Sequence, residues 1–282
     1  MAIKTLVLDF DGTFTDVEQE AAPFHPEFRS LLSDLLGRDV TDEWERARVE
    51  IENAPEQHGW VFAGKVVAPA TADPYLLGTA IVQSVFDRAG VLKGATLRTE
   101  ISQALYKLAY QKTRTAFAEG AREVLADVAA RVDLSVFVVT NSDTHAVAKK
   151  LETLLPGALR AGHVRGDAKK FWVTEPDSVD ELFGKVPETV RLGSLPRPVY
   201  LRRGKYYEAL ARIWNDTMSS PAETLVCGDI YELDLALPAA LGTRIALAPR
   251  RNTLAYEKEA TLAANGTVLG SLKDLLGLLG GP

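Results

Sequence analysis

The chain has 282 residues, of which 46% are apolar and 25% are charged, and its formal net charge is −6 at pH 7. This length suits one large domain or a domain with an insert, and the composition is that of an ordinary globular protein. The acidic balance argues against a nucleic-acid partner, and no apolar run is long enough to span a bilayer.

Two further features bear on the compartment. The N-terminus MAIKTLVLDF lacks the charged region, apolar stretch and cleavage site of a signal peptide. Cys227 is the single cysteine, which excludes an internal disulfide and fits a reducing compartment. We therefore expect a cytoplasmic location and no membrane partner.

In chain order, the hydrophobic pattern predicts a short buried strand at Thr5–Leu8 and no equally apolar strand until Leu134–Val139. Trp60–Val67, within this interval, is rich in β-formers around a turn at Ala63-Gly64. Helical patterns occupy most of the remaining interval. The predicted helices are Pro26–Leu36, Thr41–Asn53, Pro74–Ala89 and Thr99–Thr113.

After this interval, helices and strands alternate regularly. The predicted elements are helix Glu119–Arg131, strand Leu134–Val139, helix Thr144–Leu155, strand Thr224–Cys227, helix Tyr231–Leu241 and strand Arg244–Ala248. Such alternation predicts a parallel sheet covered on both faces. We therefore predict a Rossmann-like α/β core of residues 1–16 and 117–282, with an inserted, mainly helical domain at 17–116. Within the core, the long segment 156–203 is expected to add a strand or hairpin from FWVTEP and RPVYLRR.

Polar side chains follow three of the predicted strands. Asp9 and Asp11 come after the first, Thr140-Asn141-Ser142 after the second, and Gly228-Asp229 after the third. In parallel sheets, ligands bind beyond the carboxyl ends of the strands. Because neighbouring carboxylates resist ionising together unless a cation or a shared proton intervenes, this edge is expected to need such a partner.

These stretches resemble the motifs of the haloacid dehalogenase superfamily, most of whose members are magnesium-dependent phosphatases. DFDGT at 9–13 is similar to the first motif, VFVVTNS to the second, with Thr140 in the hydroxyl position, and GDIYELD at 228–234 to the fourth. The resemblance implies that Asp9 is the nucleophile and Asp11 the general acid/base. It also implies that 17–116 is a cap domain.

The same resemblance implies a Mg²⁺ ion held by the Asp9 carboxylate, the Asp11 backbone carbonyl and Asp229, with Asp234 as a positioning carboxylate. The chemistry agrees with these roles, because Mg²⁺ prefers hard oxygen ligands and keeps several waters. An aspartate can attack phosphorus to give an aspartyl-phosphate, and a second carboxylate can protonate the leaving oxygen.

The remaining candidate residues of the motifs would position the phosphoryl group. Gly12 permits a tight backbone next to the nucleophile, and Asn141 lies beside the phosphate-binding position. Thr140 can donate its hydroxyl to a phosphoryl oxygen, with capping of the helix that begins near Asp143 as the alternative role.

The family pattern also requires a cation that stabilises the transferring phosphoryl group, usually a lysine. No Lys-Pro pair precedes the helix KYYEALARIW, and LRRGK stands there instead. Lys205 is our choice, with Arg203 as the reserve, although a guanidinium differs from an ammonium in geometry. Lys169 and Lys170 are less favoured because they lie in a polar turn.

The predicted function is hydrolysis of a small phosphorylated metabolite through an aspartyl-phosphate. A dehalogenase would share the nucleophile but does not need the second carboxylate at Asp11. A phosphomutase would share every core motif. A non-catalytic binding protein is disfavoured by the complete set of carboxylates, namely Asp9, Asp11, Asp229 and Asp234.

Overall fold

The computed structural model describes residues 2–159, 161–193 and 195–280. The chain divides into two compact units, one made of Met1–Asp16 with Phe117–Pro282 and the other of Val17–Ala116. We call the first the core unit and the second the helical unit. No helix within the described ranges is long and apolar enough to cross a membrane.

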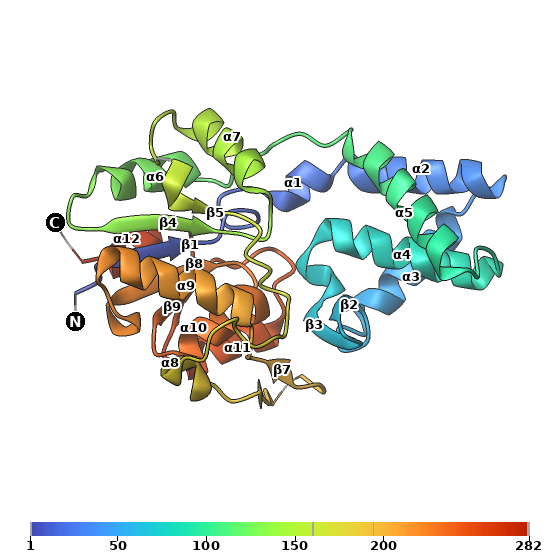
Figure 1. The fold of residues 1–282 in the computed structure, drawn as a ribbon. Helices are drawn as coiled ribbons and strands as arrows, with labels where there is room; N and C mark the ends of the chain where they lie inside the picture. Colours follow the sequence, from blue (N-terminus) through green and yellow to red (C-terminus); the bar gives the residue numbers. More distant parts are fainter. Residues whose placement is uncertain (1, 160, 194, 281–282) are drawn as a thin grey trace. The chain divides into compact units, whose positions relative to one another are not determined.

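The core unit is built on a six-stranded parallel sheet in the order β10-β9-β8-β1-β4-β5 (Figure 1). This arrangement confirms the predicted α/β class. The central strand β1 (Thr5–Leu8) pairs with β4 (Ser135–Val139) on one side and with β8 (Thr224–Gly228) on the other. The outer strands are β5 (Val164–Arg165), β9 (Arg244–Leu247) and β10 (Thr267–Val268).

Helices cover both faces of this sheet, as Figure 1 shows for α6 and α7 on one side and α9 and α10 on the other. The alternation of side chains along β1 explains this burial. Val7 packs in one apolar cluster with Leu210 of α9, whereas Leu6 and Leu8 pack in another with Val124 of α6. The helices of the core unit are α6 (Ala121–Ala130), α7 (Thr144–Leu154), α8 (Glu181–Gly184), α9 (Gly204–Thr217), α10 (Ala236–Ala240), α11 (Ala255–Ala263) and α12 (Asp274–Leu278).

The described part of the core unit also contains three short helical turns: the 3₁₀ turns η2 (Ala161–His163) and η3 (Pro221–Glu223), and the π-helical turn η4 (Tyr231–Leu235). The predicted helix at 231–241 is thus divided between η4 and α10. The π-helical turn carries most of the acidic motif that follows β8, and π-helical turns often occur at functional sites.

The long segment between β5 and α9 differs from the prediction. RPVYLRR contributes β7 (Val199–Tyr200), but its antiparallel partner is β6 (Thr189–Val190) rather than FWVTEP. The latter stretch makes a single parallel bridge, from Thr174 to Arg203. The hairpin of FWVTEP with RPVYLRR is therefore wrong, because a hairpin needs antiparallel strands joined by a tight turn, whereas the alternative, an extra strand, is present as β7.

The helical unit has its own apolar core, which includes Phe24, Phe28 and Trp44. Its strands form an antiparallel hairpin whose turn residues Ala63 and Gly64 have φ angles of 49° and 77°, which confirms the predicted turn. The elements are α1 (Val17–Ala21), α2 (Phe24–Leu36), α3 (Thr41–Glu52), β2 (Gly59–Phe62), β3 (Lys65–Pro69), η1 (Ala70–Ala72), α4 (Pro74–Ala89) and α5 (Ala95–Tyr110).

Candidate active site

The candidate site lies at the carboxyl edge of the three central strands of the core unit. Leu8 at the end of β1 pairs with Val138 in β4 and with Cys227 in β8. The next residue of the first strand, Asp9, therefore stands level with the ends of both neighbours. Thr140 and Asp229 follow those two neighbours directly, so the fold brings the predicted polar residues to one edge.

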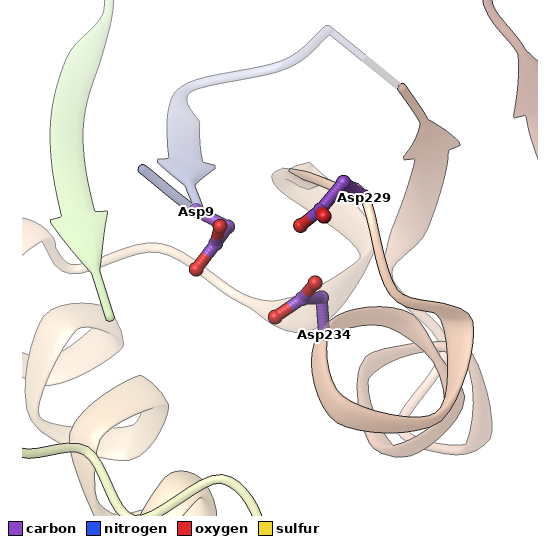
Figure 2. A group of neighbouring side chains, drawn as sticks. All are labelled: Asp9, Asp229 and Asp234. Carbon is purple, nitrogen blue, oxygen red and sulfur yellow. The ribbon is translucent and has the colours of Figure 1, made fainter. Parts of the chain in front are cut away.

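Three buried carboxylates form the centre of this site. Figure 2 shows the side chains of Asp9, Asp229 and Asp234 pointing toward one another. One oxygen from each lies within 4.8 Å of the others, and all three residues are buried. Such a cluster of like charges in a low-dielectric environment requires compensating positive charge.

Lys170 supplies part of that charge from within the protein. Its Nζ lies 2.7 Å from Asp9 Oδ1 and 2.8 Å from Asp234 Oδ1, and its side chain is 1% exposed. Burial alone would lower the pKa of Lys170, but the charges of Asp234 and Asp9 outweigh burial and raise this pKa. The ammonium group is therefore charged and held against the predicted nucleophile.

Burial also acts on the nucleophile itself. It raises the pKa of Asp9 to about 7, with the Lys170 charge opposing this rise and the Asp234 charge adding to it. Thr13 donates a long hydrogen bond of 3.4 Å to Asp9 Oδ2. One oxygen of Asp9 is thus held by the lysine while the other lies on the side of the Thr13 hydroxyl.

In the structure, Lys170 is paired with two of the three clustered carboxylates, whereas Lys205 is paired with other acidic residues and Arg203 with backbone carbonyls. Lys205 Nζ contacts Asp177 at 2.6 Å and Glu208 at 3.1 Å, and its side chain is 32% exposed. Arg203 is fully buried, but its guanidinium donates to the backbone carbonyls of Tyr200 and Lys170. Thus Lys170, which the sequence analysis placed in a polar turn, occupies the position expected for Lys205 or Arg203.

The shortness of strand β5 explains why the sequence pattern does not favour Lys170 as the cation for the phosphoryl group. The two residues of β5 give no detectable periodicity, so the loop after it is not recognised as another strand end at the site. Of the two lysines in that loop, Lys169 pairs with Asp167 at 3.0 Å in solvent, whereas Lys170 turns inward. Sequence alone does not distinguish these adjacent lysines.

Asp11 is engaged by two residues that the sequence analysis did not single out as partners. Ser142 Oγ donates to Asp11 Oδ2 at 2.6 Å, and Lys150 Nζ lies 2.8 Å from Asp11 Oδ1. The Asp11 side chain is therefore directed to the loop after β4 and to α7, and does not join the acidic cluster. The Asp11 side chain remains 26% exposed, so water can reach it.

Gly12 is required by the close approach of two loops. Its φ angle is +91°, and a Cβ at this position would lie 2.2 Å from Asp229 Oδ2. Any side chain would therefore displace Asp229 and also strain the backbone. The predicted need for glycine in this motif has a specific cause, namely contact with the acidic loop after β8.

Asp229 offers an unused oxygen to the site. Its Oδ2 lies 2.9 Å from Arg250 Nε, whereas its Oδ1 is buried and has no hydrogen-bond partner among the described residues. Burial raises the pKa of Asp229 and the charge of Arg250 opposes this rise. An orphaned carboxylate oxygen next to Asp9 is the kind of hard donor that Mg²⁺ binds, so these residues fit the metal.

Asp234 has both oxygens engaged by protein donors. Oδ1 accepts from Lys170, and Oδ2 accepts the backbone N–H of Ile230 at 2.9 Å. These bonds fix the start of η4 and the position of the Lys170 ammonium.

The residues after β4 organise the loop beside the nucleophile. Thr140 is buried and its Oγ1 accepts the N–H of Ser142 at 3.1 Å. Asp143, rather than Thr140, caps α7, with its Oδ1 accepting the N–H of Ala146 at 2.9 Å. Asn141 Oδ1 accepts the N–H of Lys170 at 2.7 Å and therefore holds the loop that carries this lysine.

No model of a known protein family matches the sequence, and no curated protein matches it. Solved structures do match. A haloacid dehalogenase-like protein of unknown function from Agrobacterium tumefaciens superposes with a TM-score of 0.54 at 16% identity, over 98% of this chain and 97% of the other. The chain has the haloacid dehalogenase fold.

Two further structures show the same haloacid dehalogenase fold. One is a Bacillus subtilis protein described as a hydrolase of this group and bound to magnesium, with a TM-score of 0.50, 14% identity and 99% coverage of both chains. The other is a hydrolase from Deinococcus radiodurans with bound phosphate and sodium, with a TM-score of 0.50, 15% identity, and coverage of 99% of this chain and 95% of that one.

In this haloacid dehalogenase fold, Lys150 and Arg250 contact site carboxylates and were not predicted, whereas Ser142 was expected only as a polar residue after the second strand and Lys170 only as a less favoured cation. Each reaches the site from a loop or helix after a core strand rather than from the strand end itself. Lys150 lies on α7 and Arg250 follows β9.

Proposed function

We propose that this chain is a magnesium-dependent phosphatase that hydrolyses small phosphate monoesters through an aspartyl-phosphate on Asp9. The observation that carries the proposal is the geometry around this carboxylate. One of its oxygens is held by the buried ammonium of Lys170, and the orphaned Oδ1 of Asp229 lies in the same cluster. A nucleophilic oxygen, a cation for the phosphoryl group and a vacant hard donor thus occur together.

Asp9, Asp229 and the backbone carbonyl of Asp11 would hold the metal. When bound, Mg²⁺ supplies positive charge that relieves the repulsion among the carboxylates and neutralises an incoming phosphate dianion. The fold is the same in one structure that holds magnesium and in another that holds phosphate, which supports the choice of metal and substrate group.

The residues of this chain then divide the reaction into two displacements. A carboxylate oxygen of Asp9 attacks phosphorus, the bond from phosphorus to the ester oxygen breaks, and Asp11 gives a proton to that leaving oxygen. In the second displacement, Asp11 takes a proton from water, the water oxygen bonds to phosphorus, and the bond from phosphorus to Asp9 breaks. Lys170 and the hydroxyl of Thr140 bind the phosphoryl oxygens during both displacements.

The second carboxylate favours phosphate esters over haloacids. A dehalogenase reaction releases halide, which needs no proton, whereas an alkoxide leaving group does. Asp11 is present, partly exposed and held by Ser142 and Lys150. We propose small phosphorylated metabolites as the substrates.

Metal dependence tests this proposal. We expect the purified protein to release phosphate from a panel of sugar, nucleotide and carboxylic-acid phosphates with Mg²⁺, and to lose this activity in excess chelator. Asp229→Asn should require more Mg²⁺, because the variant lacks one anionic oxygen ligand. Asp177→Asn is the matched control, since Asp177 pairs with Lys205 at the exposed surface. Full wild-type activity in excess chelator would show that the metal assignment is wrong.

A further inference from the structure

Several backbone N–H groups of the loop that contains Lys170 donate hydrogen bonds to the segment after β4. The N–H of Asp167 donates to Ser142 O at 2.9 Å, and the N–H of Ala168 donates to Thr140 O at 3.0 Å. The N–H of Gly166 donates to Thr144 Oγ1 at 3.0 Å. We call residues 166–170 the lysine loop. The backbone of the lysine loop is thus hydrogen-bonded to the segment that contains Thr140, the residue predicted to bind a phosphoryl oxygen.

The lysine loop holds an unfavourable backbone conformation. Asp167 and Lys169 have φ angles of 52° and 49°, in the left-handed region that residues with a Cβ rarely adopt. Such conformations persist only where the surrounding structure determines them, and they concentrate at functional sites. The turn therefore depends on its hydrogen bonds to direct Lys170 inward while Lys169 points to solvent.

Two side chains form hydrogen bonds with the backbone of Lys170 itself. Asn141 Oδ1 accepts its N–H at 2.7 Å, and an Nη1–H of Arg203 donates to its carbonyl oxygen at 2.6 Å. The Arg203 Nε–H also donates to Tyr200 O at 3.0 Å, so one guanidinium ties the lysine loop to the residues before α9. Both peptide groups that flank the Lys170 side chain are therefore fixed.

The buried charge of Arg203 needs an explanation beyond packing. The residue is 0% exposed, and burial lowers the pKa of its guanidinium to about 10, so it stays charged at neutral pH. A buried charge is costly, and an apolar side chain of similar volume fills space without that cost. The guanidinium provides directed hydrogen bonds to the backbone carbonyls of Tyr200 and Lys170. The ammonium of Lys170 in turn contacts Asp9.

We propose that Arg203 and Asn141 are positioning residues that hold the Lys170 ammonium against Asp9 for phosphoryl transfer. This inference rests on the proposed phosphatase function. It gives Arg203 a role that differs from direct contact with phosphate: the residue acts through Lys170. The expected signature is therefore a loss of kcat that disappears when Lys170 is already absent, because positioning has value only while the positioned group is present.

The test is a double-mutant cycle between Arg203→Lys and Lys170→Met, with kcat and KM measured for a small phosphate ester at saturating Mg²⁺. Arg203→Lys keeps the charge but cannot span two carbonyl oxygens as the guanidinium does. We expect it to lower kcat by about 10²-fold, with KM changed much less, because a displacement of about 1 Å in a catalytic group has an effect of this size. In the Lys170→Met background the same change should have little further effect.

Arg202→Lys is the matched control. Arg202 also donates to a backbone carbonyl, that of Val186, and pairs with Glu175 outside the site. Arg202→Lys should leave kcat unchanged in each background, that is, equal to the wild-type value in the wild type and to the Lys170→Met value in Lys170→Met. Equal losses in the Arg202 and Arg203 variants, or losses that multiply in the Lys170→Met background, would overturn the positioning role.

Asn141→Ala keeps the inference testable if Arg203→Lys does not fold, as judged by circular dichroism. Asn141 is partly exposed, and its Oδ1 accepts the N–H of Lys170, whereas Arg203 contacts the carbonyl oxygen of that residue. The double-mutant cycle of Asn141→Ala with Lys170→Met should therefore show the same non-additive effect on kcat. Additive effects would again contradict the inference. If the wild type hydrolyses no ester, the proposed function fails instead. Calorimetric binding of inorganic phosphate in Mg²⁺ then replaces kcat as the readout of the same two cycles.

Discussion

Replacement of Asp9 by asparagine is expected to abolish phosphate release while leaving the fold intact. The amide is nearly isosteric, and its carbonyl oxygen can still accept the hydrogen bond from Lys170 Nζ, which lies 2.7 Å from Asp9 Oδ1. The amide is not a nucleophile, however, so the first displacement cannot begin. Loss of the nucleophile from a hydrolase lowers kcat by about 10⁶-fold, which would leave no measurable turnover.

The measurement is phosphate release at saturating Mg²⁺, with circular dichroism and thermal unfolding as checks on the fold. Asp133→Asn serves as the control, because Asp133 is an exposed carboxylate paired with Arg131 at 2.7 Å. It should behave as the wild type. Asp9→Asn with substantial activity would mean that another group attacks phosphorus.

The second large effect is expected at Lys170. Lys170→Met removes the ammonium that contacts Asp9 and Asp234, and loss of one preorganised charge contact at the transition state costs about 10²- to 10³-fold in kcat. Lys205→Met should change kcat little, since the Lys205 ammonium pairs with Asp177 and Glu208 rather than with a carboxylate of the site. The comparison measures kcat for both variants under the same conditions.

Stability provides a second readout for the same pair of variants. Lys170→Met leaves two buried carboxylates without their shared partner, and breaking a buried ion pair costs about 3–5 kcal/mol. We therefore expect a lower thermal midpoint for this variant, partly recovered by Mg²⁺. Lys170→Arg distinguishes the effect of the positive charge on stability and kcat from the effect of the ammonium geometry, because arginine keeps the charge but has a planar guanidinium. A larger loss of kcat in Lys205→Met than in Lys170→Met would mean that Lys205, and not Lys170, is the cation that stabilises the phosphoryl group.

The core sheet was predictable because its central strands are continuous apolar runs. Thr5–Leu8, observed as β1, and Ser135–Val139, observed as β4, are bounded by polar residues on the carboxyl side, so both their position and their ligand-binding edge follow from sequence. The edge strands β5 and β10 were missed, since each has only two residues. Short edge strands are defined by pairing with a neighbour, which no local pattern reveals.

The candidate site divides in the same way. Asp9 and Asp229 directly follow central strands, and their convergence was expected. Lys170 comes from a loop whose direction depends on two left-handed residues and on bonds to Asn141 and Arg203, all of which are tertiary features. Lys205 was chosen for its position at a helix start, which does not determine which way a side chain turns, and its ammonium pairs with Asp177 and Glu208.

The most direct test of the central claim is detection of the phosphoryl group on Asp9. We would use Asp11→Asn with an ester whose leaving group needs no proton, such as p-nitrophenyl phosphate. This variant can form the aspartyl-phosphate but lacks the base that activates water, so the intermediate should accumulate. The reaction is quenched in acid and the digested protein is mapped by mass spectrometry. The account predicts one phosphoryl group on the peptide that contains Asp9. Release of p-nitrophenol with an unmodified Asp9 peptide, or with the phosphoryl group on another residue, would contradict it.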